Sequence, residues 1–327
     1  MKKAVSFLIS VYASVPVLLY LFPWILGHAI FAHLLRFPFF VDLSRPEDVL
    51  NHTCNFYLST EEGVSVGVWH TLPASQWDDA LGRSPEWYRE TLGDGRPIII
   101  YLHGNVGTRW DESILSAAGY HVLSVDYRGF GDSTGEPSEA GLTSDALYLY
   151  DWVKKQSRGS LVCLWGHSLG SGSVSSKGTL TLHGSAVDAL ILEAPYTRIG
   201  EVVAIHPLIK MYMFLPGFES LLRNIMQKIN IVFANDENLK TLTSPLLILH
   251  SKDDSIVPHH MGQKLYEISL QTQKRHNTDV QVKMFSYDEN LGFSHSNIYL
   301  DPNLPNNFPV AAMFLITIFV HSFGFFN

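Results

Sequence analysis

A serine between two glycines follows an apolar run near the middle of the chain. The segment Gly166-His167-Ser168-Leu169-Gly170 comes directly after residues 161–165, which are predicted to form a buried strand. A Gly-x-Ser-x-Gly pattern at a strand-to-helix turn is typical of a nucleophile elbow, where the serine backbone is strained and side chains at the glycine positions would collide. The pattern alone is common, so its place after a strand carries the prediction that Ser168 is a nucleophile.

The acid that supports such a serine is expected later in the chain, just after a strand. Asp253 and Asp254 directly follow residues 246–250, a predicted buried strand. The spacing Asp254-x-x-Val257-Pro258 is typical of a triad acid, so Asp254 is predicted to be the acid and Asp253 is the alternative.

The base is expected after the acid, beyond the last strand. His295 follows residues 280–285, the last predicted strand, and is the predicted base. The chain has 15 histidines, so alternatives exist. His276 precedes that strand and His321 lies in an apolar terminal run, which leaves His295 as the histidine in the expected order.

Together these residues predict acyl transfer through a serine ester. The loop after the predicted strand 98–102 contains His103-Gly104-Asn105, and a loop at this place supplies one backbone N–H to the oxyanion. Asn105 is the predicted donor, and Leu169, directly after the nucleophile, is the second. This chemistry needs no metal ion and no cofactor, so we expect neither.

Predicted strands and helices alternate from residue 98 onwards, which implies an α/β fold with a mainly parallel central sheet and helices on both faces. Residues 73–95 are expected to form a loop, and residues 196–242, rich in Met and aromatic residues, an inserted cap. The other predicted strands are 54–58, 64–69, 121–125 and 189–192, and the predicted helices are 111–118 and 144–156, the latter with Thr143 as its N-cap.

The composition limits the function. A chain of 327 residues that is 46% hydrophobic can bury a full core. Its net charge of 23 − 31 = −8 provides no basic surface, which argues against a nucleic-acid partner. The two cysteines, Cys54 and Cys163, argue against a disulfide framework and a cysteine metal site.

The N-terminus has no formally charged residue from 4 to 35, longer than the ~20 apolar residues that span a bilayer as a helix. We expect residues 1–36 to be a transmembrane anchor; a signal peptide and a buried helix are the alternatives. Lys2 and Lys3 favour a cytosolic N-terminus, and the sequon at Asn51 could be glycosylated only in the lumen. A catalytic domain, 37–307, would follow, and then an apolar segment, 308–327, whose role the sequence leaves open.

Longer motifs of the chain resemble the membrane-anchored lysophosphatidylserine lipase family of α/β-hydrolases, from about residue 11 to residue 304. They lie at residues 51–57, 67–71, 101–105, 126–133, 165–170, 233–238 and 244–250. The resemblance implies an α/β-hydrolase fold, a single-pass anchor and a lumenal catalytic domain in the endoplasmic reticulum. It also implies hydrolysis of lysophospholipids, chiefly lysophosphatidylserine, with monoacylglycerols as further substrates. The family's triad falls on Ser168, Asp254 and His295, and its glycosylated sequon on Asn51.

Three segments depart from that family. The chain is shorter between Asn105 and Gly119, residues 171–178 are rich in Gly and Ser and form helix poorly, and residues 308–326 are an apolar run in place of an amphipathic helix. These departures bear on activity more than on fold.

The cap is expected to hold the acyl chain of a lipid. Met211, Met213, Phe214 and Phe218 are the predicted substrate-binding residues, because their apolar side chains suit a lipid beside a membrane; packing as core is the alternative. The expected partners are therefore a lipid substrate and the membrane. A thioesterase or peptidase with the same triad, and an inert protein that keeps the fold, remain as other functions.

Overall fold

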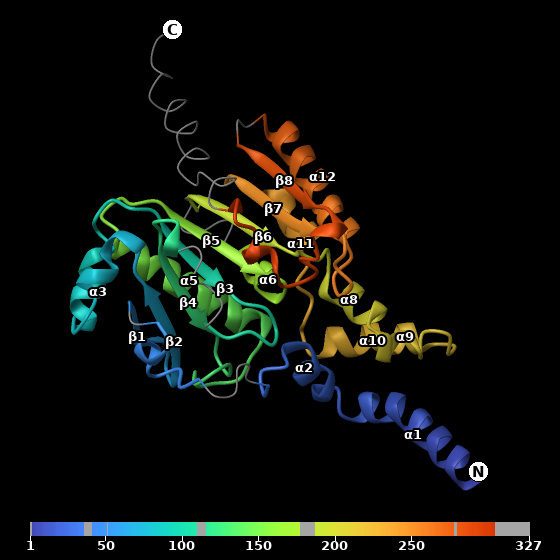
Figure 1. The fold of residues 1–327 in the computed structure, drawn as a ribbon. Coiled ribbons are helices and arrows are strands. Elements are labelled where there is room, and N and C mark those ends of the chain that lie inside the picture. Colours follow the sequence, from blue (N-terminus) through green and yellow to red (C-terminus); the bar gives the residue numbers. More distant parts are fainter. Residues whose placement is uncertain are drawn as a thin grey trace.

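The computed structural model of the protein describes residues 2–35, 41–50, 52–109, 116–176, 187–277 and 280–304. Within these residues eight strands form one sheet in the order β1-β2-β4-β3-β5-β6-β7-β8 (Figure 1). β2 pairs antiparallel with both β1 and β4, and all pairs from β4 to β8 are parallel. The strands are β1 (Thr53–Glu61), β2 (Val64–Thr71), β3 (Ile98–Leu102), β4 (His121–Asp126), β5 (Val162–His167), β6 (Ala189–Glu193), β7 (Leu246–Ser251) and β8 (Val282–Tyr287).

The predicted mainly parallel sheet is confirmed, and each strand that the sequence predicts overlaps one of these eight. The central strands β3 and β6 are buried along their whole length, and β5 is buried up to its last residue, His167, as expected for parallel strands covered on both faces. Alternate residues feed two cores. Ile98, Ile100 and Leu102 pack in the larger core, whereas Ile99 and Tyr101 pack in the smaller core with Ile298 and Leu304.

The helices of the larger face are α5 (Glu139–Gln156), α6 (Leu169–Val174) and α12 (His259–His276). α5 begins earlier than predicted, because Ser138 rather than Thr143 is its N-cap and accepts a hydrogen bond from the Gly141 N–H at 3.0 Å. The segment expected to be a loop at 73–95 contains η2 (Ala74–Asp79) and α3 (Pro85–Thr91). Ser84 caps α3 and Pro85 occupies its first turn, a start signal in the sequence that the loop assignment overlooked.

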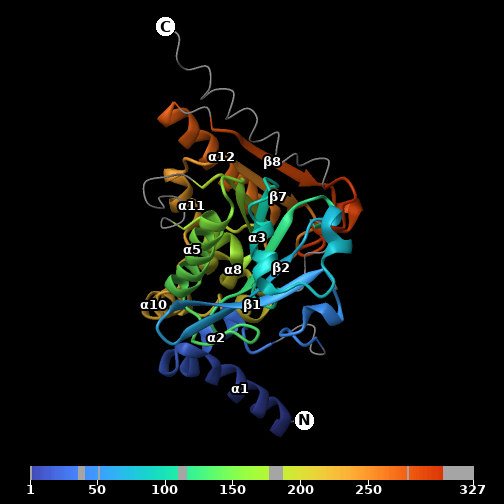
Figure 2. The same ribbon diagram turned by 90° about the vertical axis from the view of Figure 1, so that its left-hand side faces the viewer.

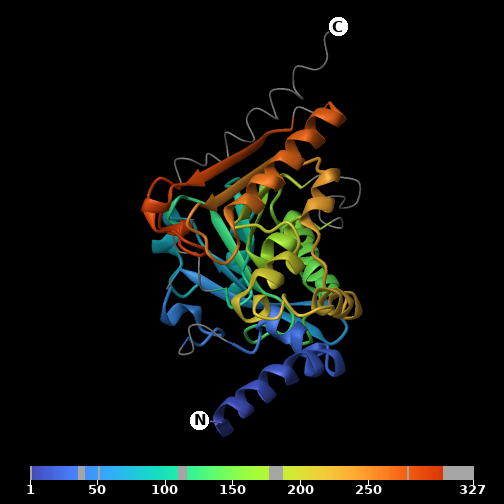
Figure 3. The same ribbon diagram turned by 90° about the vertical axis from the view of Figure 1, so that its right-hand side faces the viewer.

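The insertion between β6 and β7 forms α8 (Ile199–Ile205), α9 (Pro207–Lys210), α10 (Phe218–Lys228) and α11 (Asn235–Asn238). Near it lie the N-terminal helices, α1 (Lys2–Leu21) and α2 (Trp24–Phe31). Figures 1 and 3 show α1 extending away from the body of the molecule on the side of α2 and α10, and Figure 2 shows the sheet above it. Short 3-10 turns complete the fold: η1 (Pro46–Asp48), η4 (Leu239–Thr241), η5 (Glu289–Leu291) and η6 (Ile298–Leu300).

Several predictions fall on residues that the structure does not describe. Asn51 is one of them, as are most of the predicted helix 111–118 and the whole apolar segment 308–327. The structure describes the Gly/Ser-rich segment as far as Ser176. In this segment α6 ends at Val174, after six residues, and Ser175 is its C-cap.

Candidate active site

Ser168 lies at the turn between β5 and α6, in a backbone conformation that few side chains adopt, with φ 49° and ψ −112°. The flanking glycines make this turn possible. A Cβ on Gly166 would overlap the backbone of Gly170, and a Cβ on Gly170 would overlap the carbonyl of Leu102 at the end of β3. Each glycine therefore allows a close backbone approach, and the strained serine is held at the carboxyl edge of the sheet.

Three of the predicted residues meet at this edge. Nε2 of His295 lies 2.9 Å from the Ser168 Oγ, and Nδ1 of His295 lies 2.7 Å from Oδ2 of Asp254. All three residues are buried, with 6–9% of the surface of each exposed. Neither rival histidine joins them, since His276 ends α12 on the surface and His321 is outside the described residues.

The environment of Asp254 keeps its carboxylate ionised. Burial alone would raise its pKa, but hydrogen bonds from His250 and His295 and from the Val257 N–H outweigh burial and hold the pKa well below the usual range. Its Oδ1 accepts from the backbone N–H groups of Ile256 and Val257, at 2.9 and 2.8 Å. A fixed negative charge therefore faces the ring of His295.

The neighbouring carboxylate, Asp253, has different partners. Its Oδ1 accepts from the Ser251 hydroxyl and, at 2.9 Å, from the Ser294 N–H. Ser294 has a positive φ of 50° and directly precedes His295. Asp253 thus holds the loop that carries the histidine, and Asp254 contacts the imidazole itself.

His167 also contacts the His295 loop, which the sequence did not indicate. Its Nε2 donates to the carbonyl of His295 at 2.9 Å. Burial is the main cause that lowers the pKa of His167, so the ring stays neutral in its fixed position. The middle residue of the elbow therefore links the serine turn to the loop of the base.

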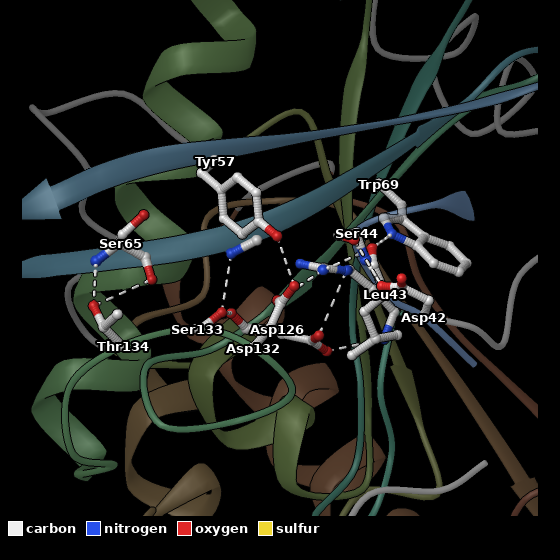
Figure 4. A network of polar contacts seen from close by, with 12 residues as sticks. Asp42, Leu43, Ser44, Tyr57, Ser65, Trp69, Asp126, Asp132, Ser133 and Thr134 are labelled. Atoms are coloured by element: carbon white, nitrogen blue, oxygen red, sulfur yellow. Dashed lines mark hydrogen bonds and ion pairs between the residues drawn. The ribbon is translucent and has the colours of Figure 1, made fainter. Parts of the chain in front are cut away.

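The loop that contains the predicted oxyanion donor Asn105 is fixed by a buried arginine. The backbone N–H of Arg109 donates to Oδ1 of Asp126 at 3.0 Å, and its guanidinium donates to Oδ1 of Asp132 at 2.7 Å and to the carbonyl of Leu43 at 3.0 Å. Figure 4 shows this network beside β2, including Asp126 and Asp132. A lone arginine in a loop gives no signal in the sequence, so Arg109 was not predicted.

The same network extends to β1 and β2. The Tyr57 hydroxyl donates to Oδ2 of Asp132 at 2.6 Å, and the Trp69 indole N–H donates to the Leu43 carbonyl at 2.8 Å (Figure 4). The Arg109 guanidinium occupies the space that a side chain on Gly67 would need. The loop 103–109 is thereby tied to the sheet and to the segment that follows the N-terminal helices.

A cavity of about 380 Å³ opens beside Ser168. Its wall carries Tyr and Ile side chains and uncharged polar groups, with no Lys or Arg among the described residues that line it. The lining residues are Tyr101, Gly104, Asn105, Val106, Gly107, His167, Ser168, Ile256, His295, Ser296, Asn297 and Tyr299. Asn105 therefore lies at the serine, and Leu169 follows the serine directly in the chain.

The four predicted substrate-binding residues are not among those that line this cavity. Phe218 is buried at the start of α10 and its ring contacts Tyr212, whereas Phe214 is 74% exposed. The Met211 carbonyl accepts a hydrogen bond from the Tyr12 hydroxyl of α1 at 2.6 Å. Met211 and Phe214 therefore contact Tyr12 of α1, and Phe218 contacts Tyr212 within the cap. Met213, which is partly buried, packs against the larger core.

Within the described residues, no single helix is long and apolar enough to cross a membrane. Residues 10–21 of α1 and helix α2 meet the length and composition requirements only as a pair, and they are bent by 99° at the break. The structure also buries Leu26, Ile30 and Phe31 of α2 in the larger core, and the carbonyl of Ile30 lies 3.4 Å from the Asn105 amide nitrogen.

Among the described residues, no group of three or more His, Cys, Asp or Glu side chains is arranged to hold a metal ion.

Comparison with known proteins places these features in a family. A family profile described as serine aminopeptidase, S33, matches residues 112–236. Solved structures with similar folds include the Pyrococcus furiosus esterase Pf2001, with a TM-score of 0.56 and 17% identity over 84% of this chain and 93% of that one. Another is Est1E from Butyrivibrio proteoclasticus with ferulic acid bound. It has a TM-score of 0.51 and 19% identity, over 82% of this chain and 99% of that one. At such identities these structures show the fold alone.

Curated relatives are much more similar in sequence. The lysophosphatidylserine lipase ABHD12 of Xenopus tropicalis is 46% identical over 312 residues, which cover 93% of this chain and 80% of the relative. The Danio rerio lysophosphatidylserine lipase ABHD12 is 42% identical, over 94% of this chain and 82% of the relative. The human protein ABHD12B is 46% identical, over 84% of this chain and 76% of the relative. Identity of this degree across most of both chains means that this chain belongs to the lysophosphatidylserine lipase family of α/β-hydrolases.

Proposed function

We propose that this serine hydrolase cleaves the acyl ester of single-chain lipids, chiefly lysophosphatidylserine, and also other lysophospholipids and monoacylglycerols. The continuous hydrogen bonding from the Ser168 Oγ through His295 to Asp254 is the observation that carries the proposal. The names of the relatives supply the lipid class.

In the proposed mechanism, the Ser168 Oγ attacks the acyl carbonyl while His295 takes its proton on Nε2. Asp254 orients the ring through Nδ1 and stabilises the imidazolium. The N–H groups of Asn105 and Leu169 hold the oxyanion. His295 returns the proton to the leaving glycerol oxygen, and the acyl group stays on Ser168. Water, deprotonated by His295, then releases the fatty acid and restores the serine hydroxyl.

The cavity beside Ser168 is the proposed place of the substrate, instead of the cap residues that the sequence indicated. Tyr101, Ile256 and Tyr299 provide apolar surface for an acyl chain. Because the described wall carries no Lys or Arg, it offers no specific charge to a phosphate and suits a neutral monoacylglycerol as well as a lysophospholipid.

The test uses purified protein and a panel of lysophosphatidylserine, monoacylglycerol, a long-chain thioester and a peptide anilide. We expect ester hydrolysis in the wild type and its loss in Ser168→Ala. Ser59→Ala, an exposed serine on β1, is the matched control and should keep full activity. Lipid hydrolysis by Ser168→Ala near the wild-type rate would refute the nucleophile. Faster cleavage of the thioester or anilide would move the function to the other acyl donors, and a fluorophosphonate probe that fails to label the folded wild type would indicate an inert protein.

We further infer that the protein works at a membrane surface. α1 presents an apolar exterior that includes Val17, Leu18 and Leu21. The cap loop, defined here as residues 207–216 with α9 and the turn that follows it, exposes Leu208 and Phe214. The ring of Tyr12 in α1 stacks on Tyr212 with centroids 4.4 Å apart, so insertion of α1 would bring the cap loop to the lipid.

The proposed membrane is that of the endoplasmic reticulum, with the catalytic domain in the lumen. Lys2 and Lys3, the first two residues of α1, and the sequon at Asn51 support this orientation. An endoglycosidase should shift the mobility of the expressed protein, and Asn51→Gln should remove the shift. A wild-type protein that is not shifted would argue against a lumenal domain.

A further inference from the structure

A second histidine lies against the acid of the site. His250, near the end of β7, is fully buried, and its Nε2 donates a hydrogen bond to the Val257 carbonyl at 2.9 Å. The same nitrogen lies 3.2 Å from Oδ2 of Asp254, the oxygen that also contacts His295. The carboxylate therefore has an imidazole on each side, and only the one from His295 faces the serine.

The surroundings of His250 define its protonation. Both groups near Nε2 are acceptors, a carbonyl and a carboxylate oxygen, so Nε2 carries a proton. Nδ1 is buried with no hydrogen-bond partner among the described residues. It faces Gly262 of α12, where any side chain would collide with the ring. A second proton on Nδ1 would be buried without an acceptor, so the neutral ring with Nε2–H is the form that fits.

Other titratable groups lie near this ring. The ring of His259, in the first turn of α12, meets that of His250 edge-on with centroids 5.4 Å apart. His260 and Lys252 interact electrostatically with His259. Asp254 is the acidic group in contact with the ring, and His295 lies on the far side of that carboxylate. The Nε2–H of His250 thus points toward the one fixed negative charge it contacts.

We propose that His250 is a positioning residue for catalysis, which holds the Asp254 carboxylate and its turn in the orientation that His295 needs. The proposal rests on the proposed role of the Ser168, His295 and Asp254 set. Two contacts explain how it acts. Asp254 accepts from the Val257 N–H, and His250 donates to the Val257 carbonyl, so the acid and its turn are fixed from both ends.

The His250 N–H also moderates how strongly Asp254 attracts the proton on Nδ1 of His295. Without it the carboxylate is more basic and stabilises the imidazolium of His295 more strongly. A higher pH is then required before His295 can act as a base. Loss of the His250 N–H should therefore move the acid limb of the kcat/KM profile to higher pH, an effect that loss of packing alone would not produce.

The experiment compares His250→Leu with His250→Gln in the full chain. The amide nitrogen of Gln reaches the position of Nε2 and can still donate, whereas Leu fills the space without a donor. We expect His250→Leu to lower kcat roughly 10- to 100-fold, the range for a hydrogen bond to a charged group, with KM nearly unchanged and the acid limb shifted upward. His250→Gln should restore most of kcat and the wild-type limb.

Rates are divided by the number of sites that a fluorophosphonate label titrates at long times, so unfolded protein does not contribute. If His250→Leu does not fold, His250→Asn replaces it, because its shorter amide reaches only the Nδ1 position. Equal kcat and equal acid limbs in the wild type and in the variant without the donor would overturn the proposal, as would failure of a folded His250→Gln to recover. An inactive wild type would instead refute the proposed function, so the two failures are distinguishable.

Discussion

At the scale of single residues, the two adjacent carboxylates after β7 have different tasks. Asp254 contacts the ring of His295, and Asp253 contacts the backbone of Ser294. A change at Asp254 would alter the electrostatics of the base, whereas a change at Asp253 would alter only the support of its loop.

We predict that Asp254→Asn is far more damaging than Asp253→Asn. The amide at 254 loses the charge and can stabilise the wrong tautomer of His295, a change that costs roughly 10⁴-fold in kcat in a serine protease triad. Asn at 253 keeps the Oδ1 acceptor for the Ser294 N–H and should cost less than about tenfold, the order of one neutral hydrogen bond. Steady-state kinetics on lysophosphatidylserine decide between them, and the reverse order of severity would make Asp253 the acid.

At the scale of the element, the position of the loop 103–109, which contains the predicted oxyanion donor Asn105, depends on the close approach of β2 to Arg109. Gly67 leaves room for the Arg109 guanidinium, which lies over the rings of Tyr57 and Trp69 and hydrogen-bonds Asp132. A buried charge held by several partners is costly to displace.

Gly67→Ala should therefore lower both stability and activity. Its Cβ would overlap the guanidinium, and overpacking of this kind typically costs ~1–3 kcal/mol of unfolding free energy. The loop 103–109 would move with Arg109, so kcat should also fall. Chemical denaturation and kinetics measure the two effects.

Gly200→Ala is the control for that variant. Gly200 lies in α8, where a Cβ meets nothing within 4 Å, so alanine should be neutral or stabilise by up to ~1 kcal/mol. Equal stability of the two alanine variants would contradict the role of Gly67.

At the scale of the whole molecule, the N-terminal helices and the cap form one apolar end. Figure 1 places α1, α2, α9 and α10 together, away from α3. α2 and Leu19, near the end of α1, contribute to the larger core, while the N-terminal part of α1 extends beyond it. An apolar stretch that looks continuous in the sequence therefore has two different surroundings.

We predict that the double variant Leu208→Ser, Phe214→Ser weakens hydrolysis of lysophosphatidylserine in phosphatidylcholine vesicles by at least about tenfold. Each side chain that leaves lipid for water loses up to ~1.5–3 kcal/mol of transfer free energy. Hydrolysis of a soluble short-chain acetate ester should not change, because neither residue is among those lining the cavity at Ser168.

Leu81→Ser serves as the control, because Leu81 is 84% exposed and precedes α3 in the chain by a few residues. Figure 1 shows α3 on the opposite side of the molecule from α1 and α10. It should leave both rates unchanged. If the cap variant changes both substrates equally, or neither, the cap loop does not contact the membrane.

The sequence by itself determined where the strands lie along the chain, the fold class and three residues that meet at one edge of the sheet. These depend on local patterns: the apolar runs of buried strands, and Ser168, Asp254 and His295 at the ends of three of them. Parallel strands end at the same edge, so residues placed after them converge even though more than 80 positions separate Ser168 from Asp254.

Only the tertiary structure decided the contacts that depend on side chains from unrelated segments. Arg109 lies in none of the quoted motifs, and it acquires its partners when distant segments pack against it. His250 ends one of those motifs, but nothing in the motif shows that the turn after β7 brings Asp254 and the Val257 carbonyl back to its ring. Four cap residues have the composition of an acyl pocket, but in the structure they contact α1, other cap residues, the larger core or solvent: Met211, Met213, Phe214 and Phe218. Composition predicts that a side chain will leave water, whereas the packing of whole elements determines which apolar surface it meets.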